Sequence, residues 1–145
     1  MGGQRGGPGL SWVDDAGLVT LPTGLRVRGR RLKDVVSPAD FSLLLADGPV
    51  PDWPHRRIRW PDFWVPRDSD DARDALREAY RRAQQGERVE VACRGGIGRT
   101  GTALAALAIL DGTAPDQALG WIRANYHPRA VETPLQKRWL RNFRQ

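Results

Sequence analysis

The sequence is poor in several residue types, and each shortage argues against a class of protein. It contains a single cysteine and two histidines among 145 residues. One cysteine excludes a disulfide within the chain, and the lack of a Cys/His cluster argues against a structural zinc site. We therefore expect a fold that depends on packing, with no metal and no cofactor, and a thiol that stays reduced in the cytoplasm.

Long apolar runs are also missing. No segment approaches the roughly 20 apolar residues that span a bilayer, and the glycine-rich residues 1–9 contain no apolar stretch of the signal-peptide kind. We expect an unprocessed intracellular chain without membrane association. A flexible tail is expected over residues 1–9 and one compact domain over residues 10–145.

Lysine is scarce, so almost all of the basic residues are arginines. The chain has 23 basic and 17 acidic residues and a formal net charge of +6 at pH 7. This balance favours anionic partners, phosphorylated ones included, but it does not by itself indicate nucleic acid. The alternative is a basic surface that only reflects an arginine-rich composition.

The most informative stretch is residues 89–110, VEVACRGGIGRTGTALAALAIL. The short apolar run at its start predicts a buried strand, and the Ala/Leu/Ile run near its end predicts a buried helix. Four glycines between them let the backbone turn tightly and point successive N–H groups into one concavity. Together with the positive end of the following helix, this loop predicts a cradle for an oxyanion.

Two side chains make this cradle a candidate for catalysis. Cys93 ends the strand, where a positive concavity favours the thiolate, which is the nucleophilic form. Arg99 begins the helix and offers a planar guanidinium that can hold two phosphate oxygens. One alternative is a buried structural thiol beside a tight turn. Another, a nucleotide-binding P-loop, fits poorly because no lysine precedes the hydroxyl residue.

The loop resembles the phosphate-binding loop of cysteine-dependent tyrosine and dual-specificity phosphatases, as found in compact, bacterial-type members. The resemblance implies that Cys93 is the nucleophile, that Arg99 binds the phosphate and that Thr100 helps the sulfur to leave. It also implies that the rest of the loop binds phosphate oxygens: Arg94, Gly95, Gly96, Ile97 and Gly98. The family usually has histidine before the nucleophile, where this chain has Ala92.

A thiolate that cleaves a phosphate ester needs an acid that protonates the leaving oxygen. Residues 60–66, WPDFWVP, resemble the mobile acid-bearing loop of the same family, and Asp62 lies 31 residues before Cys93 (93 − 62). The resemblance implies that Asp62 is the acid and later the base, with Asp52 and Asp68 as the fallback candidates. The other interpretation is that Asp62 caps a turn after proline.

Residues 131–136, VETPLQ, resemble the glutamine-bearing loop of the family. The resemblance implies that Gln136 helps to place the water that attacks the phosphocysteine. Glu132 stands where tyrosine-specific members often have another glutamine, and its charge is expected to face an arginine such as Arg129. The alternative for Gln136 is a surface amide in the first turn of a helix.

Periodicity and turn residues predict the other elements. Strands are expected over residues 10–13, 18–21, 25–27, 41–46 and 55–60, and helices over residues 68–85, over 113–126 with a capping box at 113–116, and from 133 onward, burying Leu135, Trp139, Leu140 and Phe143. This order suggests an α/β fold with the active loop at the carboxyl end of a strand. The resemblance implies a single-domain protein-tyrosine-phosphatase-like fold, with a short mixed sheet flanked by helices.

The function implied is that of a metal-independent protein phosphatase acting on phosphotyrosine, and on phosphoserine or phosphothreonine if the pocket is shallow, through a phosphocysteine intermediate. Arg94 would favour multiply charged or acidic-flanked substrates. Ile97 stands where phosphoinositide phosphatases tend to have a basic residue. The competing hypotheses are a phosphopeptide-binding module with weak or no turnover, suggested by Ala92 and Glu132, and an RNA 5′-phosphatase, which would suit the charge.

Overall fold

The computed structural model describes Trp12 and residues 16–144. Its helices and strands follow in the order β1 (Leu18–Thr20), β2 (Arg26–Arg31), β3 (Phe41–Leu44), β4 (His55–Arg57), α1 (Ser69–Gln84), β5 (Val89–Cys93), α2 (Gly98–Leu110), α3 (Ala118–Asn125) and α4 (Pro134–Arg141). The strand predicted at residues 10–13 lies outside the described residues, except for Trp12. Within the described part of the chain, every helix is too short or too polar to span a bilayer.

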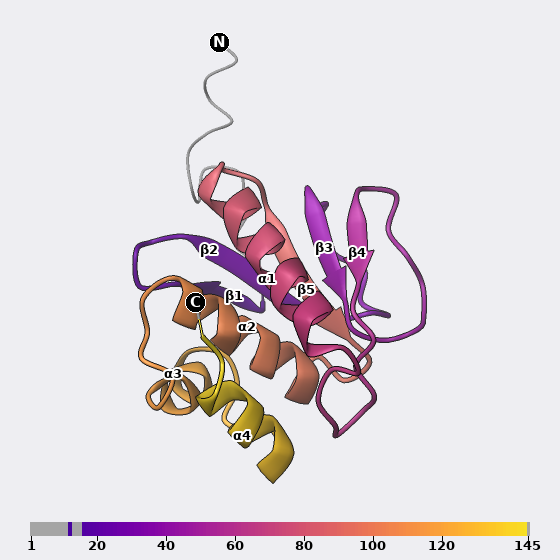
Figure 1. Ribbon diagram of the computed structural model, residues 1–145. Coiled ribbons are helices and arrows are strands. Elements are labelled where there is room, and N and C mark those ends of the chain that lie inside the picture. The colour runs from indigo at the N-terminus through magenta and orange to yellow at the C-terminus, as the bar shows by residue number, and fades with distance from the viewer. Residues whose placement is uncertain (1–11, 13–15, 145) are drawn as a thin grey trace.

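Strand β5 lies at the centre of a mixed sheet whose strand order is β1-β2-β5-β3-β4 (Figure 1). β1 pairs antiparallel with β2, and every other neighbouring pair is parallel. The carboxyl ends of the parallel strands therefore meet at one edge of the sheet. The predicted mixed sheet is confirmed, and the glycine-rich loop leaves from this edge.

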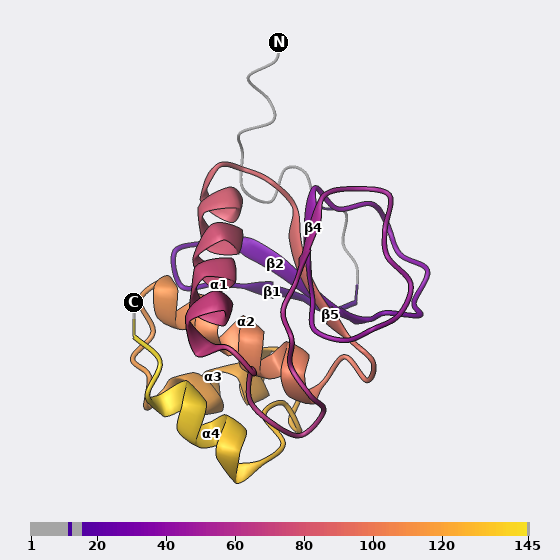
Figure 2. The same ribbon diagram turned by 45° about the vertical axis from the view of Figure 1, so that its right-hand side comes forward.

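α1 and α2 pack against one face of the sheet, and α3 and α4 pack on α2 from the side away from the sheet (Figure 2). β5 alternates across the sheet, so that Val89, Val91 and Cys93 join the helix-side core while Ala92 lies on the opposite face. Residues 98–109 of α2 are all buried. A helix that is covered on every side needs no polar stripe, which explains the apolar composition of this segment.

The predicted starts of two helices are confirmed by their caps. Asp68 precedes α1 and its side chain accepts a hydrogen bond from the backbone N–H of Asp71. Thr133 precedes α4 and forms a capping box with Gln136. Such caps satisfy backbone N–H groups that have no partner within the helix.

Other boundaries were predicted wrongly. The capping box at residues 113–116 is absent: α3 begins at Ala118, because the N–H of Thr113 still bonds the Ala108 carbonyl at the end of α2. The strand predicted over residues 55–60 stops at Arg57, since its neighbour β3 ends at Leu44. Leu135 was predicted to be buried, but it is 42% exposed because α4 packs through other positions.

The face of the sheet opposite the helices contains a buried charge cluster. Glu90 of β5 is fully buried and accepts hydrogen bonds from Arg28 and Arg30 of β2 and, at 2.6 Å, from the hydroxyl of Ser42 of β3. One carboxylate therefore joins three adjacent strands. Two buried guanidinium groups depend on this single anion, since a buried charge without a partner is strongly unfavourable.

The charge cluster makes the folding stability depend on pH. Burial by itself raises the pKa of Glu90, but hydrogen bonds from Arg30 and Ser42 and the charge of Arg28 together hold that pKa below its ordinary value. A carboxyl whose pKa is lower in the folded than in the unfolded protein contributes stability above its unfolded pKa. That contribution is lost as the pH falls through the folded pKa.

We predict that Glu90→Gln lowers the free energy of unfolding at pH 7 by about 3–5 kcal/mol, since it leaves two buried arginines without their carboxylate. The difference between variant and parent should shrink as the pH falls below the ordinary glutamate value and through the lowered pKa of Glu90, since the parent then also loses its carboxylate. Urea denaturation at several pH values measures both effects.

Glu87→Gln is the matched control. Glu87 pairs with Arg82 near the surface, and such pairs contribute at most about 1 kcal/mol. If Glu90→Gln destabilised the protein no more than Glu87→Gln does, the assignment of Glu90 as the anion that holds the sheet would be wrong.

Candidate active site

The glycine-rich loop places the thiol of Cys93 at the carboxyl end of β5 with two donors aimed at it. Its Sγ accepts hydrogen bonds from the backbone N–H of Gly96 at 3.2 Å and from the hydroxyl of Thr100 at 2.9 Å. Cys93 is only 2% exposed. Two donors directed at one sulfur favour a negative charge on it.

The tight turn of the loop depends on Gly96. Its φ is +68°, in the left-handed region, and a Cβ there would come within 2.9 Å of the Arg30 backbone. α2 then begins at Gly98, preceded by Ile97, whose side chain makes no capping hydrogen bond. The unpaired first-turn N–H groups and the helix dipole therefore favour an anion beside the sulfur, as the sequence predicts.

Arg99 is buried beside this loop, and its buried Nε makes no hydrogen bond to a described residue. Its Nη1 donates to the carbonyls of Leu45 at 3.2 Å and Trp60 at 2.8 Å, and the side chain is 5% exposed. A buried unpaired donor is costly in a folded protein, so a bound oxyanion would supply the missing partner.

Asp62 lies next to that unused donor. Its Oδ1 is 3.5 Å from Nε of Arg99, and its side chain is 54% exposed. The two residues also line a cavity of about 460 Å³. The structure thus brings Asp62 and Arg99 together, whereas the fallback Asp68 serves as the N-cap of α1 and Asp52 does not line this cavity.

The segment that carries Asp62, residues 60–66, is called the acid loop here, and α4 holds it in place. The Thr133 hydroxyl donates to the Phe63 carbonyl at 2.9 Å, and the Gln136 side-chain amide donates to the Trp64 carbonyl at 3.1 Å. Phe63 has a φ of +66°, an uncommon conformation for a residue with a side chain. The two hydrogen bonds from the start of α4 are therefore made to the strained turn that directly follows Asp62.

The buried Gln136 uses both ends of its side-chain amide in such contacts. Its Oε1 accepts from the backbone N–H groups of Glu132 and Thr133, and its amide nitrogen reaches the acid loop, not the sulfur. The carboxylate of Glu132 lies against Gly98, where an added Cβ would be 2.1 Å from its Oε1. Glu132 and Arg129, which were expected to face one another, line the same cavity, but the described residues show no ion pair between them.

Tyr126 is a site residue that the sequence did not reveal. Its hydroxyl donates to the Gly96 carbonyl, and Gly29 leaves the room for it, since a Cβ there would be 2.5 Å from that hydroxyl. Burial, followed by the charges of Cys93 and Asp34, raises the pKa of Tyr126, so that the phenol stays a donor. This bond holds the Gly96 carbonyl while the Gly96 N–H points at the sulfur.

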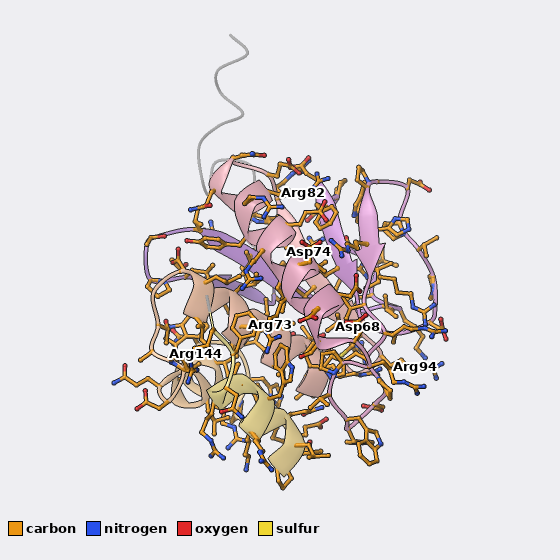
Figure 3. The ribbon with its side chains drawn as sticks, in the orientation of Figure 1. Asp68, Arg73, Asp74, Arg82, Arg94 and Arg144 are labelled. Carbon is orange, nitrogen blue, oxygen red and sulfur yellow. The ribbon has the colours of Figure 1, made fainter. Side chains whose placement is uncertain are left out.

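Arg94 differs from the rest of the loop because its side chain is exposed at the edge of the molecule (Figure 3), where it lines the same cavity of about 460 Å³ as Asp62 and Arg99. The described residues contain no group of three or more His, Cys, Asp or Glu side chains that could hold a metal ion. Cys93, Arg99 and Asp62 bring a thiol, a guanidinium and a carboxyl group to this edge of the sheet.

Comparisons with known proteins agree with this arrangement. The family model of the protein-tyrosine phosphatases matches residues 53–128, just over half of the chain. Human tyrosine-protein phosphatase non-receptor type 4 is 36% identical over 89 residues, which is 57% of this chain. The chain spans only 10% of that human protein.

Solved structures show the same fold. Tk-PTP in its active form has a TM-score of 0.65 and 27% identity, over 72% of this chain and 78% of that one. Kinase associated phosphatase has a TM-score of 0.70 over 92% of this chain and 95% of that one, and at 16% identity it supports the fold alone. The chain therefore belongs to the protein-tyrosine phosphatase family, within the cysteine-dependent tyrosine and dual-specificity superfamily.

Proposed function

We propose that this protein removes phosphate from phosphotyrosine in proteins, and from phosphoserine or phosphothreonine as well, through a phosphocysteine intermediate. The observation that carries the proposal is the site around Cys93. Its sulfur accepts two hydrogen bonds, and Nε of Arg99, which makes no hydrogen bond to a described residue, lies 3.5 Å from Oδ1 of Asp62. A nucleophile, an anion clamp and a proton donor thus converge on one edge of the sheet.

The first step would form the sulfur–phosphorus bond. The Cys93 thiolate attacks phosphorus while the ester oxygen leaves, and Asp62 gives its proton to that oxygen. The guanidinium of Arg99 and the loop N–H groups hold the equatorial oxygens, where charge is redistributed in the transition state. The acid loop, with α4 beneath it, positions Asp62 for the transfer.

The second step would release inorganic phosphate. Water attacks phosphorus, Asp62 accepts a proton from that water, and the sulfur leaves as a thiolate. The Thr100 hydroxyl, 2.9 Å from Sγ, stabilises the departing charge. Ala92, which occupies the usual histidine position, is buried on the far face of the sheet. Stabilisation of the thiolate therefore rests on Gly96, Thr100 and the start of α2.

We predict that Cys93→Ser abolishes release of p-nitrophenol from p-nitrophenyl phosphate, because a serine hydroxyl without a nearby base is a poor nucleophile. The variant should still bind phosphate, since the loop N–H groups and Arg99 remain. Activity assays and isothermal titration calorimetry measure the two properties. Phosphopeptide binding by the parent protein without any turnover would instead support the binding-module hypothesis.

We predict that Asp62→Ala lowers kcat by about 10²–10⁴-fold, the usual contribution of a positioned acid, and leaves phosphate affinity largely intact. The loss should be greater for phenyl phosphate than for p-nitrophenyl phosphate, because a more basic leaving oxygen needs the proton more. Asp52→Ala is the matched control and should behave like the parent. Equal losses in both variants would remove Asp62 from its role as the acid.

We propose that Gln136 is a positioning residue for the acid loop in the state described. Gln136→Glu keeps an oxygen for the capping box but removes the amide donor to Trp64. We predict that it lowers kcat by about tenfold, because a buried hydrogen bond is lost. Rapid-mixing kinetics with p-nitrophenyl phosphate should show slower formation of the phosphocysteine and no initial burst of p-nitrophenol. A burst would mean that hydrolysis of the phosphocysteine has become the slow step, which would contradict this proposal and assign Gln136 to the placing of water.

A further inference from the structure

The sulfur of Cys93 has few donors. Among the described residues, one backbone N–H, that of Gly96, and one side chain, that of Thr100, donate a hydrogen bond to it. The residue before it, Ala92, has no side-chain donor and lies on the far face of the sheet. A movement of the Gly96 peptide would therefore remove one of the two hydrogen bonds that the described residues make to the sulfur.

Gly96 lies in a part of the loop that its own chemistry restrains little. It follows Gly95, and both lack the Cβ that restricts φ and ψ in other residues. The φ of +68° at Gly96 is one of several angles that are open to glycine. A contact from outside the loop is therefore required to select the conformation in which the Gly96 N–H faces the sulfur.

The Tyr126 hydroxyl supplies such a contact. It donates to the Gly96 carbonyl, while the N–H of the same residue donates to the sulfur. Because peptide bonds are planar, fixing the carbonyl fixes ψ of Gly96 and limits the rotations that would turn its N–H away. Tyr126 and Gly96 line a cavity of about 580 Å³ that shares no residue with the cavity beside Asp62 and Arg99, so the phenol reaches the loop from another side.

Strand β2 leaves the space that this contact needs. A Cβ at Gly29 would come within 2.5 Å of the Tyr126 hydroxyl and within 2.8 Å of Cγ2 of Thr100. The same glycine thus makes room for both side chains that control the donors to the sulfur. A glycine inside a strand weakens it, and this close approach is the reason for its presence there.

The chain that carries the phenol is held to α3. The N–H of Tyr126 donates to the Ile122 carbonyl at 2.8 Å. The Arg123 side chain donates to the carbonyls of Ala130 at 2.9 Å and Val131 at 2.7 Å. These bonds fold the segment after α3 back onto the helix, so the phenol projects from a fixed backbone.

We propose that Tyr126 is a positioning residue for the nucleophile: its hydroxyl holds the Gly96 peptide so that the Gly96 N–H stabilises the Cys93 thiolate. The proposal rests on the proposed function in taking Cys93 to be the nucleophile. Burial first, and then the charges of Cys93 and Asp34, raise the pKa of Tyr126. The phenol therefore keeps its proton while the thiol ionises, and it remains a hydrogen-bond donor.

The alternative is that the Tyr126 hydroxyl only stabilises the fold, and the chain contains a matched control for that role. It has two tyrosines, and the other one, Tyr80 of α1, donates to Asp111 at 2.6 Å. Asp111 lies at the end of α2 opposite to Arg99. Tyr80→Phe and Tyr126→Phe therefore remove the same group, one far from the catalytic loop and one beside it.

The first measurement titrates the thiol directly. Cys93 is the only cysteine, so the ultraviolet absorbance of the thiolate is obtained by subtracting the spectrum of the same protein carrying Cys93→Ser. We expect the pH midpoint of this absorbance to rise by about one unit in Tyr126→Phe, because a misaligned donor stabilises the charge less. Tyr80→Phe should keep the midpoint of the parent.

The second measurement is the pH profile of activity on p-nitrophenyl phosphate. The kcat/KM of Tyr126→Phe should be about tenfold below that of the parent at pH values under both midpoints, and should approach it above them. A hydroxyl with a structural role alone would lower kcat/KM equally at every pH. Urea denaturation checks that the variants are folded. If Tyr126→Phe does not fold, Gly29→Ala displaces the phenol from the side of β2 and should raise the midpoint as well.

The outcomes separate this proposal from the proposed function. If the parent hydrolyses no p-nitrophenyl phosphate, the proposed function fails, whereas a midpoint that rises in Tyr126→Phe still supports the positioning of the sulfur's donor. If the parent is active but Tyr126→Phe and Tyr80→Phe have the same midpoint, the positioning role alone is overturned. A loss of kcat/KM that does not vary with pH overturns it too.

Discussion

One buried guanidinium connects the parts of this molecule that the proposed chemistry requires. Arg99 stands at the start of α2 and donates to the carbonyl of Leu45, just after β3, and to that of Trp60, where the acid loop begins. A single side chain therefore fixes the helix, the sheet edge and the acid loop relative to one another. Because these bonds use Nη1, the Nε remains available in a fixed direction. Donors that are oriented before a ligand arrives need no reorganisation when charge develops.

The sequence predicted the parts of the site that are local in the chain. Cys93, its glycines and Arg99 lie within seven residues, and the strand, turn and helix that contain them have clear patterns of apolar and glycine residues. The caps of α1 and α4 were equally readable, since a cap involves residues three positions apart. Asp62 came from a resemblance and not from periodicity. The structure brings its carboxyl group near Arg99, although the catalytic role remains a proposal.

Contacts between distant residues could not be predicted in this way. Tyr126 reaches Gly96 across 30 positions, and Arg28 reaches Glu90 across 62. No local pattern marks either pair, because each depends on which strands and helices become neighbours. The cavity that Asp62 and Arg99 line shows the same limit: Arg59 and Arg67 appear in the sequence as ordinary basic residues. Only the folded chain brings them to the lining of that cavity.

The position of β5 has a consequence for the order of assembly. β5 pairs with both β2 and β3, although it follows both of them in the chain. During synthesis, the inner edges of those two strands stay unpaired until residues 89–93 have emerged, so the sheet forms from non-local contacts. β5 ends in Cys93. The pairing of β5 with β2 and β3 therefore also brings the sulfur near its two donors, the Gly96 N–H and the Thr100 hydroxyl. An incompletely folded chain therefore lacks the geometry that would activate its thiol.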